Sequence, residues 1–214
     1  REYAGLAARL SDTAGVTAIE VNLSCPNAED AGQSFALDPQ RAGSVIAAVR
    51  GSARYDIPVF AKLSPDVTDI VAVASACVVS GADGLSLVNT LLGMVIDPVT
   101  VRPLLAGRYG GLSGPAIRPV AVRCVWQVRA AFPAVPIIGT GGVRTGRDAL
   151  ELLLAGASMI AVGTEIMHDP SACSRVLKEL EEELAALGAD RAADVTGQAH
   201  GTYGRFSRGP ARPA

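Results

Sequence analysis

The chain has 214 residues, of which 49% are hydrophobic and 4% aromatic, and its formal net charge is −2. This length supports one domain with a sizeable core, and the near-neutral charge without a Lys/Arg cluster argues against a nucleic-acid surface. No apolar stretch has the length of a membrane span. The four cysteines are too widely spaced for a zinc site or an iron–sulfur cluster, so we expect no metal and a cytoplasmic chain with reduced thiols.

Strand-like apolar runs alternate with helical patterns along the chain, which begins within a helical pattern. The expected strands are 16–24, 58–64, 84–90, 135–142 and 159–164. The expected helices are 39–50, 68–80, 115–131, 147–155 and 170–187. A long loop is expected between the third strand and the helix that follows it. Residues 1–187 therefore read as one domain, and residues 188–214, rich in Arg, Gly and Pro, as a flexible tail.

Strict β–α alternation with apolar strands indicates an α/β fold with a parallel sheet covered by helices. An open doubly wound sheet and a (β/α)8 TIM barrel both fit, but no G-x-G-x-x-G follows the first strand. The last two strands end in the glycine-rich stretches "GTGGV" and "AVGT", and loops after strands seven and eight of a barrel commonly bind phosphate. We therefore expect the last five βα units of a barrel, with three further units upstream of them.

Cys25 follows the first strand in "VNLSCPN". A free cysteine is most often a small buried hydrophobe, but this one stands before a proline in a polar loop at the strand's carboxyl end. A thiol there can act as a nucleophile or base once it is activated. Cys77, Cys124 and Cys173 fall within helical patterns, and we expect them to serve in packing.

Polar side chains also end the next strands. Lys62 lies in an apolar strand, so it either extends its amine to solvent or needs an anionic partner. Asn22, Asn27 and Asn89, with Thr90, place amides at one rim, where they would suit a flat, amide-like ligand such as a pyrimidine. Asn and Thr are also ordinary turn formers.

Glycine pairs end the last two strands. Gly141–Gly142 and Gly163–Thr164 are either tight turns or backbone N–H groups that approach a phosphate at a helix start. His168, one of two histidines, follows the last strand, and we expect it at the surface or at a helix end.

Six ordered motifs resemble the class 1 dihydroorotate dehydrogenases: "EVNLSCPN", "AKLSPDVTDI", "LVNTLLGMVID", "GGLSGPAIRPVA", "IIGTGGV" and "AVGTE". "NTLLGM" and "GGLSGPAIRP" are most similar to the NAD-linked 1B subgroup. The resemblance implies oxidation of dihydroorotate to orotate in pyrimidine biosynthesis, with FMN as the cofactor. It also implies a separate electron-transfer subunit with FAD and a [2Fe–2S] cluster, in a homodimer or heterotetramer.

The resemblance assigns roles residue by residue. Cys25 matches the base that takes the C5 proton of dihydroorotate, while hydride from C6 goes to FMN. Asn22 matches a residue that contacts both FMN and substrate. Matches to pyrimidine contacts are Asn27, Asn89 and Thr90. The family's residues that contact the flavin correspond to Lys62, Val88 and Gly114. Its residues that bind the FMN phosphate correspond to Gly141, Gly142, Gly163 and Thr164.

Three alternatives stay open. The pyrimidine-reducing domain of dihydropyrimidine dehydrogenase shares the "NLSCP" type of loop. A phosphate-binding barrel isomerase or lyase without flavin would share the glycine-rich turns. A fragment without its first three units would be inactive alone.

Overall fold

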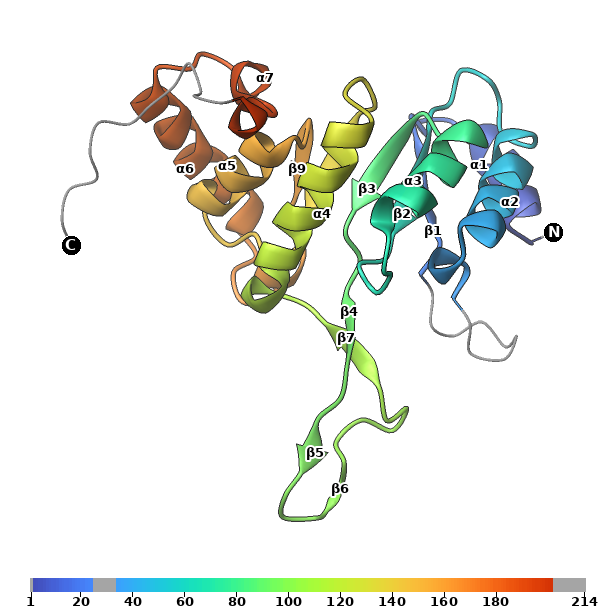
Figure 1. Cartoon of the computed structure of the whole chain (residues 1–214), viewed down its shortest axis with the longest axis horizontal. Coiled ribbons are helices and arrows are strands. Elements are labelled where there is room, and N and C mark those ends of the chain that lie inside the picture. Colours follow the sequence, from blue (N-terminus) through green and yellow to red (C-terminus); the bar gives the residue numbers. More distant parts are fainter. Residues whose placement is uncertain (1, 25–33, 202–214) are drawn as a thin grey trace.

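The structure, a computed structural model, describes residues 2–24 and 34–201. Its centre is a five-stranded parallel sheet with the strand order β1-β2-β3-β8-β9 (Figure 1). The strands are β1 (Ile19–Asn22), β2 (Val59–Leu63), β3 (Gly84–Leu87), β8 (Ile137–Thr140) and β9 (Met159–Ala161). Since the strands are parallel and follow one another in chain order, all their carboxyl ends meet at one edge of the sheet.

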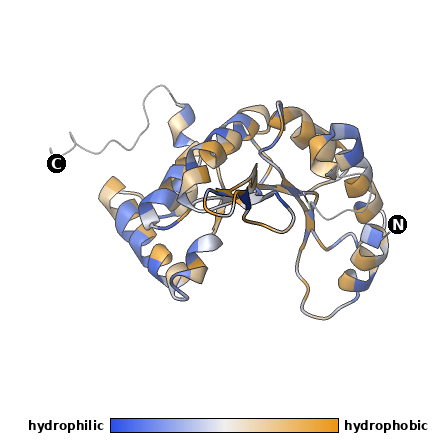
Figure 2. Cartoon of the chain, turned by 90° about the horizontal axis from the view of Figure 1, so that it is seen from below, coloured by the Kyte–Doolittle hydropathy of each residue, from blue (hydrophilic) through white to orange (hydrophobic). Residues whose placement is uncertain are grey.

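Six long helices cover one side of the sheet, and Figure 2 shows them in an arc around it. They are α1 (Glu2–Ser11), α2 (Pro39–Arg50), α3 (Ile70–Val79), α4 (Arg118–Ala131), α5 (Gly146–Ala155) and α6 (Ala172–Leu187). Each packs against the next one along the chain. All the predicted strands and helices are confirmed to within a few residues, apart from the arm and the C-terminal segment described below. No helix in these ranges is long and apolar enough to cross a membrane.

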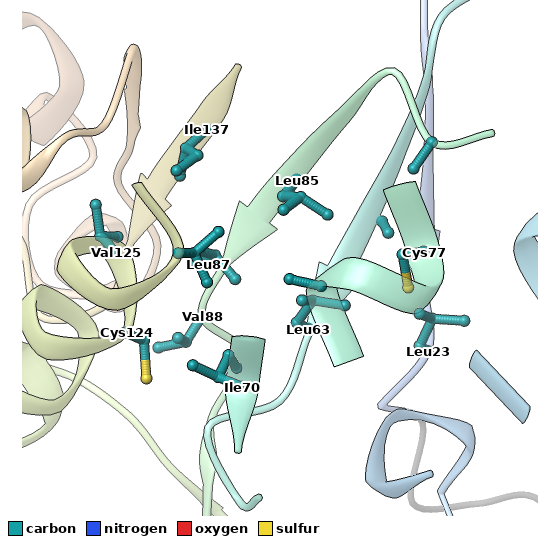
Figure 3. Packing of buried hydrophobic residues seen from close by; sticks show 14 of the residues in the cluster. Leu23, Leu63, Ile70, Cys77, Leu85, Leu87, Val88, Cys124, Val125 and Ile137 are labelled. Atoms are coloured by element: carbon teal, nitrogen blue, oxygen red, sulfur yellow. The ribbon is translucent and has the colours of Figure 1, made fainter. Parts of the chain in front are cut away.

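The two faces of the sheet differ in burial. In β2, Val59, Ala61 and Leu63 are fully buried in the core against the helices, whereas Phe60 and Lys62 alternate with them and are half-buried. This alternation follows from the period of two in a strand. Figure 3 shows the helix-side core, with side chains of α3 and α4 beside those of β2, β3 and β8. The face of the sheet that carries Lys62 is not covered by these helices.

Two of the cysteines expected in packing are in this core. Cys77 on α3 and Cys124 on α4 are buried (Figure 3), and burial raises the pKa of both thiols, that of Cys77 to about 12. The prediction was wrong for Cys173, which is exposed at the start of α6. Cys173 is not among the buried residues of this helix, which are Ala172, Val176 and Leu184.

Helix starts are marked by side-chain caps. Asp38 caps α2 by accepting from Arg41 N at 2.8 Å, and Asp69 accepts from two amides at the start of α3. Such caps satisfy N–H groups that have no partner within the helix.

The predicted loop after β3 is an arm of two short antiparallel pairs. Strand β4 (Leu91–Gly93) pairs with β7 (Gly110–Leu112), and β5 (Ile96–Asp97) pairs with β6 (Arg102–Pro103). Figure 1 shows this arm extending away from the sheet. Strands of two or three residues are too short to show a period in the sequence, which is why a loop was expected here.

The chain after α6 also differs from the expected flexible tail. Helix α7 (Ala192–Val195) and the 3-10 helix η4 (Gln198–His200) pack on α5, where Val195 is fully buried beside Leu153. The His200 ring stacks on Trp126 of α4 with centroids 3.7 Å apart. Isolated apolar residues hold this segment, and they give no periodic signal. Residues 202–214 lie outside the described residues.

Candidate active site

A cavity of about 410 Å³ lies at the carboxyl ends of the sheet strands, in the size range of small-molecule sites. It is lined by nine of the residues that the sequence singled out: Lys62, Val88, Asn89, Thr90, Gly114, Gly141, Gly142, Gly163 and Thr164. Five separate stretches of the chain supply them. The parallel sheet brings these stretches together because it ends all its strands at the same edge.

The turn after β8 can be built only from glycine. Gly141 and Gly142 have φ angles of 123° and 78°, which side chains rarely adopt. A Cβ on Gly142 would lie 2.9 Å from the carbonyl oxygen of Gly114 and 3.0 Å from the nitrogen of Arg118. The main chain of this turn therefore lies directly against the segment that precedes α4, and that contact forms one wall of the cavity.

The turn after β9 adds main-chain donors. Gly163 and Thr164 lead into the 3-10 helix η3 (Thr164–Met167), and Thr164 Oγ1 donates to Ser113 Oγ at 2.8 Å. Within residues 2–24 and 34–201, the N–H groups of Gly142, Gly163 and Thr164 have no acceptor. Free amides on the wall of a cavity are suited to bind an anion such as a phosphate.

Ion pairs lie behind these two turns. The buried carboxylate of Glu165 accepts from Arg144 Nε at 3.0 Å and from Arg175 Nη2 at 3.2 Å. Arg175 also pairs with Asp169 and Glu179. Hydrogen bonds from Ser171 and Arg175 lower the pKa of the Asp169 carboxyl to about 2. These pairs join the loops after β8 and β9 to α6, so they hold the two turns at a fixed separation.

Three backbone amides at and just before the start of α5 are already bound to carboxylates. Asp148 Oδ2 accepts from the backbone nitrogens of Arg144 and Thr145, at 3.0 Å each. Glu179 Oε2 accepts from Gly146 N at 2.8 Å, and this hydrogen bond lowers the pKa of Glu179. The positive end of the α5 dipole is thus covered by two carboxylates of the protein itself.

The opposite end of the cavity is formed by side chains. Lys62 Nζ lies 3.3 Å from Glu20 Oε1 on the neighbouring strand, so Glu20 provides a partner that the sequence pattern did not identify. Asn89 Nδ2 donates to Asn22 Oδ1 at 3.0 Å, and Asn89 Oδ1 accepts from Thr90 N at 2.8 Å. Asn22 itself borders an adjacent groove beside α1.

The sequence did not identify several residues that line the cavity, and two of the predicted site residues lie outside the described residues. The cavity also contacts Ser113, Thr140, Arg144, Glu165 and His168. Glu165 directly follows Thr164 and Arg144 comes two residues after Gly142, and this closeness in the sequence was the one available signal. His168 ends η3 and is exposed, as expected. Cys25 and Asn27 lie outside the described residues, so their roles stay predictions.

Comparisons with known proteins agree with this arrangement. The family model described as "Dihydroorotate dehydrogenase" matches residues 1–184. A relative from Desulforudis audaxviator, named dihydroorotate dehydrogenase B (NAD(+)), catalytic subunit, is 50% identical over 203 residues, covering 95% of this chain and 65% of the relative. A relative of the same name from Listeria monocytogenes is 47% identical over 194 residues, covering 91% of this chain and 63% of the relative.

A solved structure is similar as well. The crystal structure of DHODH in complex with ferulenol from Eimeria tenella superposes with a TM-score of 0.71 at 27% identity, covering 86% of this chain and 54% of that chain. The chain thus spans less than two thirds of the length of these relatives. Because the family model covers most of the chain and the relatives are about half identical to it, the chain belongs to the dihydroorotate dehydrogenase family.

Proposed function

We propose that this chain provides the flavin site and the proton acceptor of an NAD-linked dihydroorotate dehydrogenase, which oxidises dihydroorotate to orotate in pyrimidine biosynthesis. The observation that carries the proposal is the single cavity formed by nine predicted residues from five stretches of chain. The names of the relatives support the reaction, since those proteins are catalytic subunits of dihydroorotate dehydrogenase B.

The residues present fit FMN. The glycine turn that a Cβ would obstruct, together with the free amides of Gly142, Gly163 and Thr164, suits the phosphate, with Gly141 in the same turn. Lys62, Val88 and Gly114 would lie along the ring system. Bound FMN would supply the acceptor for the hydride that leaves C6 of dihydroorotate.

The amides of the protein would orient the pyrimidine. Asn22 Oδ1 already accepts from Ser24 N and from Asn89 Nδ2, at 3.0 Å each. Its own NH2 group is then left to donate to a ligand oxygen. Asn27 and Thr90 would add contacts to the same ring. This arrangement suits the carbonyl and carboxylate oxygens of dihydroorotate, which accept hydrogen bonds.

Cys25 would act as the base that removes the C5 proton. It is separated from Ser24, the last described residue of that loop, by one peptide bond, and Asn22 lies three residues before it. A thiol with an ordinary pKa of about 8.5 becomes an effective base when local hydrogen bonds favour the thiolate. The sulfur would accept the C5 proton, while FMN would accept the hydride from C6.

We also propose that the sheet is part of a closed barrel. Its strand order runs without reversal, whereas an open doubly wound sheet reverses at a switch point. Its helices cover one side in an arc (Figure 2). Both features favour a (β/α)8 TIM barrel, of which these strands and helices would be the last five units.

The partners and the compartment belong to the proposal too. The words "catalytic subunit" in the names of the relatives imply a second subunit in those proteins. For this chain we propose a separate electron-transfer subunit that carries FAD and a [2Fe–2S] cluster, in a homodimer or heterotetramer in the cytoplasm.

The absorption spectrum tests this function directly. The protein expressed from its full reading frame is expected to be yellow, and anaerobic addition of dihydroorotate is expected to bleach the flavin band. A colourless protein would favour a barrel isomerase or lyase without flavin. A yellow protein that dihydroorotate leaves unbleached, but that reduces uracil or thymine, would favour the dihydropyrimidine dehydrogenase type of reaction.

A further inference from the structure

The end of the cavity formed by the turns after β8 and β9, here called the glycine end, is surrounded by acidic side chains. Three arginines near it, Arg118, Arg144 and Arg175, are met by five carboxylates. These carboxylates are Asp148, Glu151, Glu165, Asp169 and Glu179. A phosphate dianion placed near them would be stabilised by a cation in addition to the main-chain amides.

The start of α5 cannot supply this charge. The amides of the two residues just before it are bound to Asp148, and the amide of its first residue, Gly146, is bound to Glu179, so carboxylates of the protein already meet the partial positive charge there. The other two arginines each pair with at least two carboxylates already. Arg118 pairs with Asp148 and Glu151, and Arg175 uses Nε and both Nη groups on three carboxylates.

Arg144 is different. Only its Nε is engaged, on Glu165, and across residues 2–24 and 34–201 its two Nη groups make no hydrogen bond or ion pair. Its side chain is 58% exposed and lines the cavity next to the Gly141–Gly142 turn. The fixed Nε contact with the buried Glu165 limits the rotamers of the guanidinium, which leaves two donors in a defined position.

We propose that Arg144 recognises the phosphate of the flavin and so makes this site selective for a phosphorylated flavin over riboflavin. The proposal rests on the proposed function, because it assumes that the cavity binds FMN. The two free Nη groups would donate to phosphate oxygens and Glu165 would orient the guanidinium, while the glycine amides bind the other phosphate oxygens.

Flavin titrations of the flavin-free protein test this inference. The measured quantity is the ratio of the dissociation constants for riboflavin and FMN, followed by flavin fluorescence. Arg144→Gln is expected to lower this preference for FMN roughly tenfold, by loss of charge-assisted hydrogen bonds at a partly exposed position, and to leave riboflavin binding unchanged. Arg144→Lys keeps the charge but not the paired donors, so it is expected to retain part of the preference.

Arg147→Gln is the matched control. It removes the same charge from α5, but Arg147 borders a separate surface groove with Thr145 and Glu182, so the preference should stay at the wild-type value. Equal weakening of both flavins in Arg144→Gln, or an unchanged preference, would overturn the inference while leaving the flavin site intact. A wild-type protein that binds neither flavin would instead overturn the proposed function.

Discussion

The two ends of the cavity are built in different ways. At the glycine end, the wall is main chain, and a Cβ on Gly142 would lie 2.9 Å from Gly114 O. At the amide end, the wall is side chains, with Asn89 bonded to Asn22 at 3.0 Å and Lys62 paired with Glu20. The difference teaches that the main-chain turns are sensitive to added volume, whereas the side-chain walls are sensitive to loss of particular donors and charges.

The largest effect is expected at the proposed base. Cys25→Ala should lower the turnover of dihydroorotate by about 10²–10⁴-fold, the usual contribution of a general base, while bound FMN is retained. Steady-state kinetics and the flavin absorbance measure the two quantities. Cys173→Ala is the control, since that thiol is exposed on α6. Comparable turnover in Cys25→Ala at neutral pH would remove Cys25 from this role.

A large effect is also expected at the glycine end. Gly142 has a φ of 78°, and an added methyl group would meet backbone atoms that cannot move aside easily. Strain of this kind costs about 1–3 kcal/mol, so Gly142→Ala should weaken FMN binding by about 5–150-fold. Gly5→Ala on α1, where nothing lies within 4 Å, is the control for a glycine substitution. Full flavin content in purified Gly142→Ala would show that this turn tolerates volume after all.

A moderate effect is expected from a substitution at the amide end. Asn89→Ala removes the donor to Asn22, and a neutral hydrogen bond contributes about 0.5–1.5 kcal/mol. The KM for dihydroorotate should therefore rise by about 2–12-fold, with the flavin content unchanged. If the variant loses flavin instead, Asn89 also holds the cofactor, and its assignment to the pyrimidine alone no longer holds.

The smallest effect concerns the ion pairs behind the glycine end. The folded pKa of Asp169 is about 2, below the ordinary value of 3.8, so its ionised form stabilises the fold at pH values above 3.8. That stabilisation is lost as the pH falls from 3.8 toward 2. Asp169→Asn should lower the thermal midpoint slightly at pH 7, and the difference should vanish at the acid end of this window. Asp190→Asn, at an exposed aspartate after α6, should keep the wild-type pH dependence.

Most of the sheet and its helices could be predicted from the sequence because their signals are local. Helix α2 occupies the predicted residues 39–50, with Pro39 at its first turn and Asp38 as its cap. The arm and the segment 189–201 could not be predicted. Their strands and helices are very short, and contacts between residues far apart in the sequence, such as the hydrogen bond from Gly197 N to Leu153 O, hold the C-terminal segment.

The candidate site divides in the same way. The glycines after β8 can be recognised from the sequence because their positive φ angles leave few alternatives to glycine. The contact of Glu165 with Arg144 and Arg175 could not be recognised, because these residues lie on three separate elements. Their order along the chain gives no sign that one buried carboxylate meets two guanidinium groups. The Lys62–Glu20 pair was missed for the same reason, since it depends on the register of β1 against β2.

The stacking of Trp126 on His200 has a practical consequence. The chain contains a single tryptophan, and its indole ring contacts the imidazole at 3.7 Å between centroids. Intrinsic emission excited at the indole band would therefore report on whether residues 198–200 are docked on α4. The molecule thus contains its own optical probe of C-terminal detachment, at a position away from the residues that line the cavity.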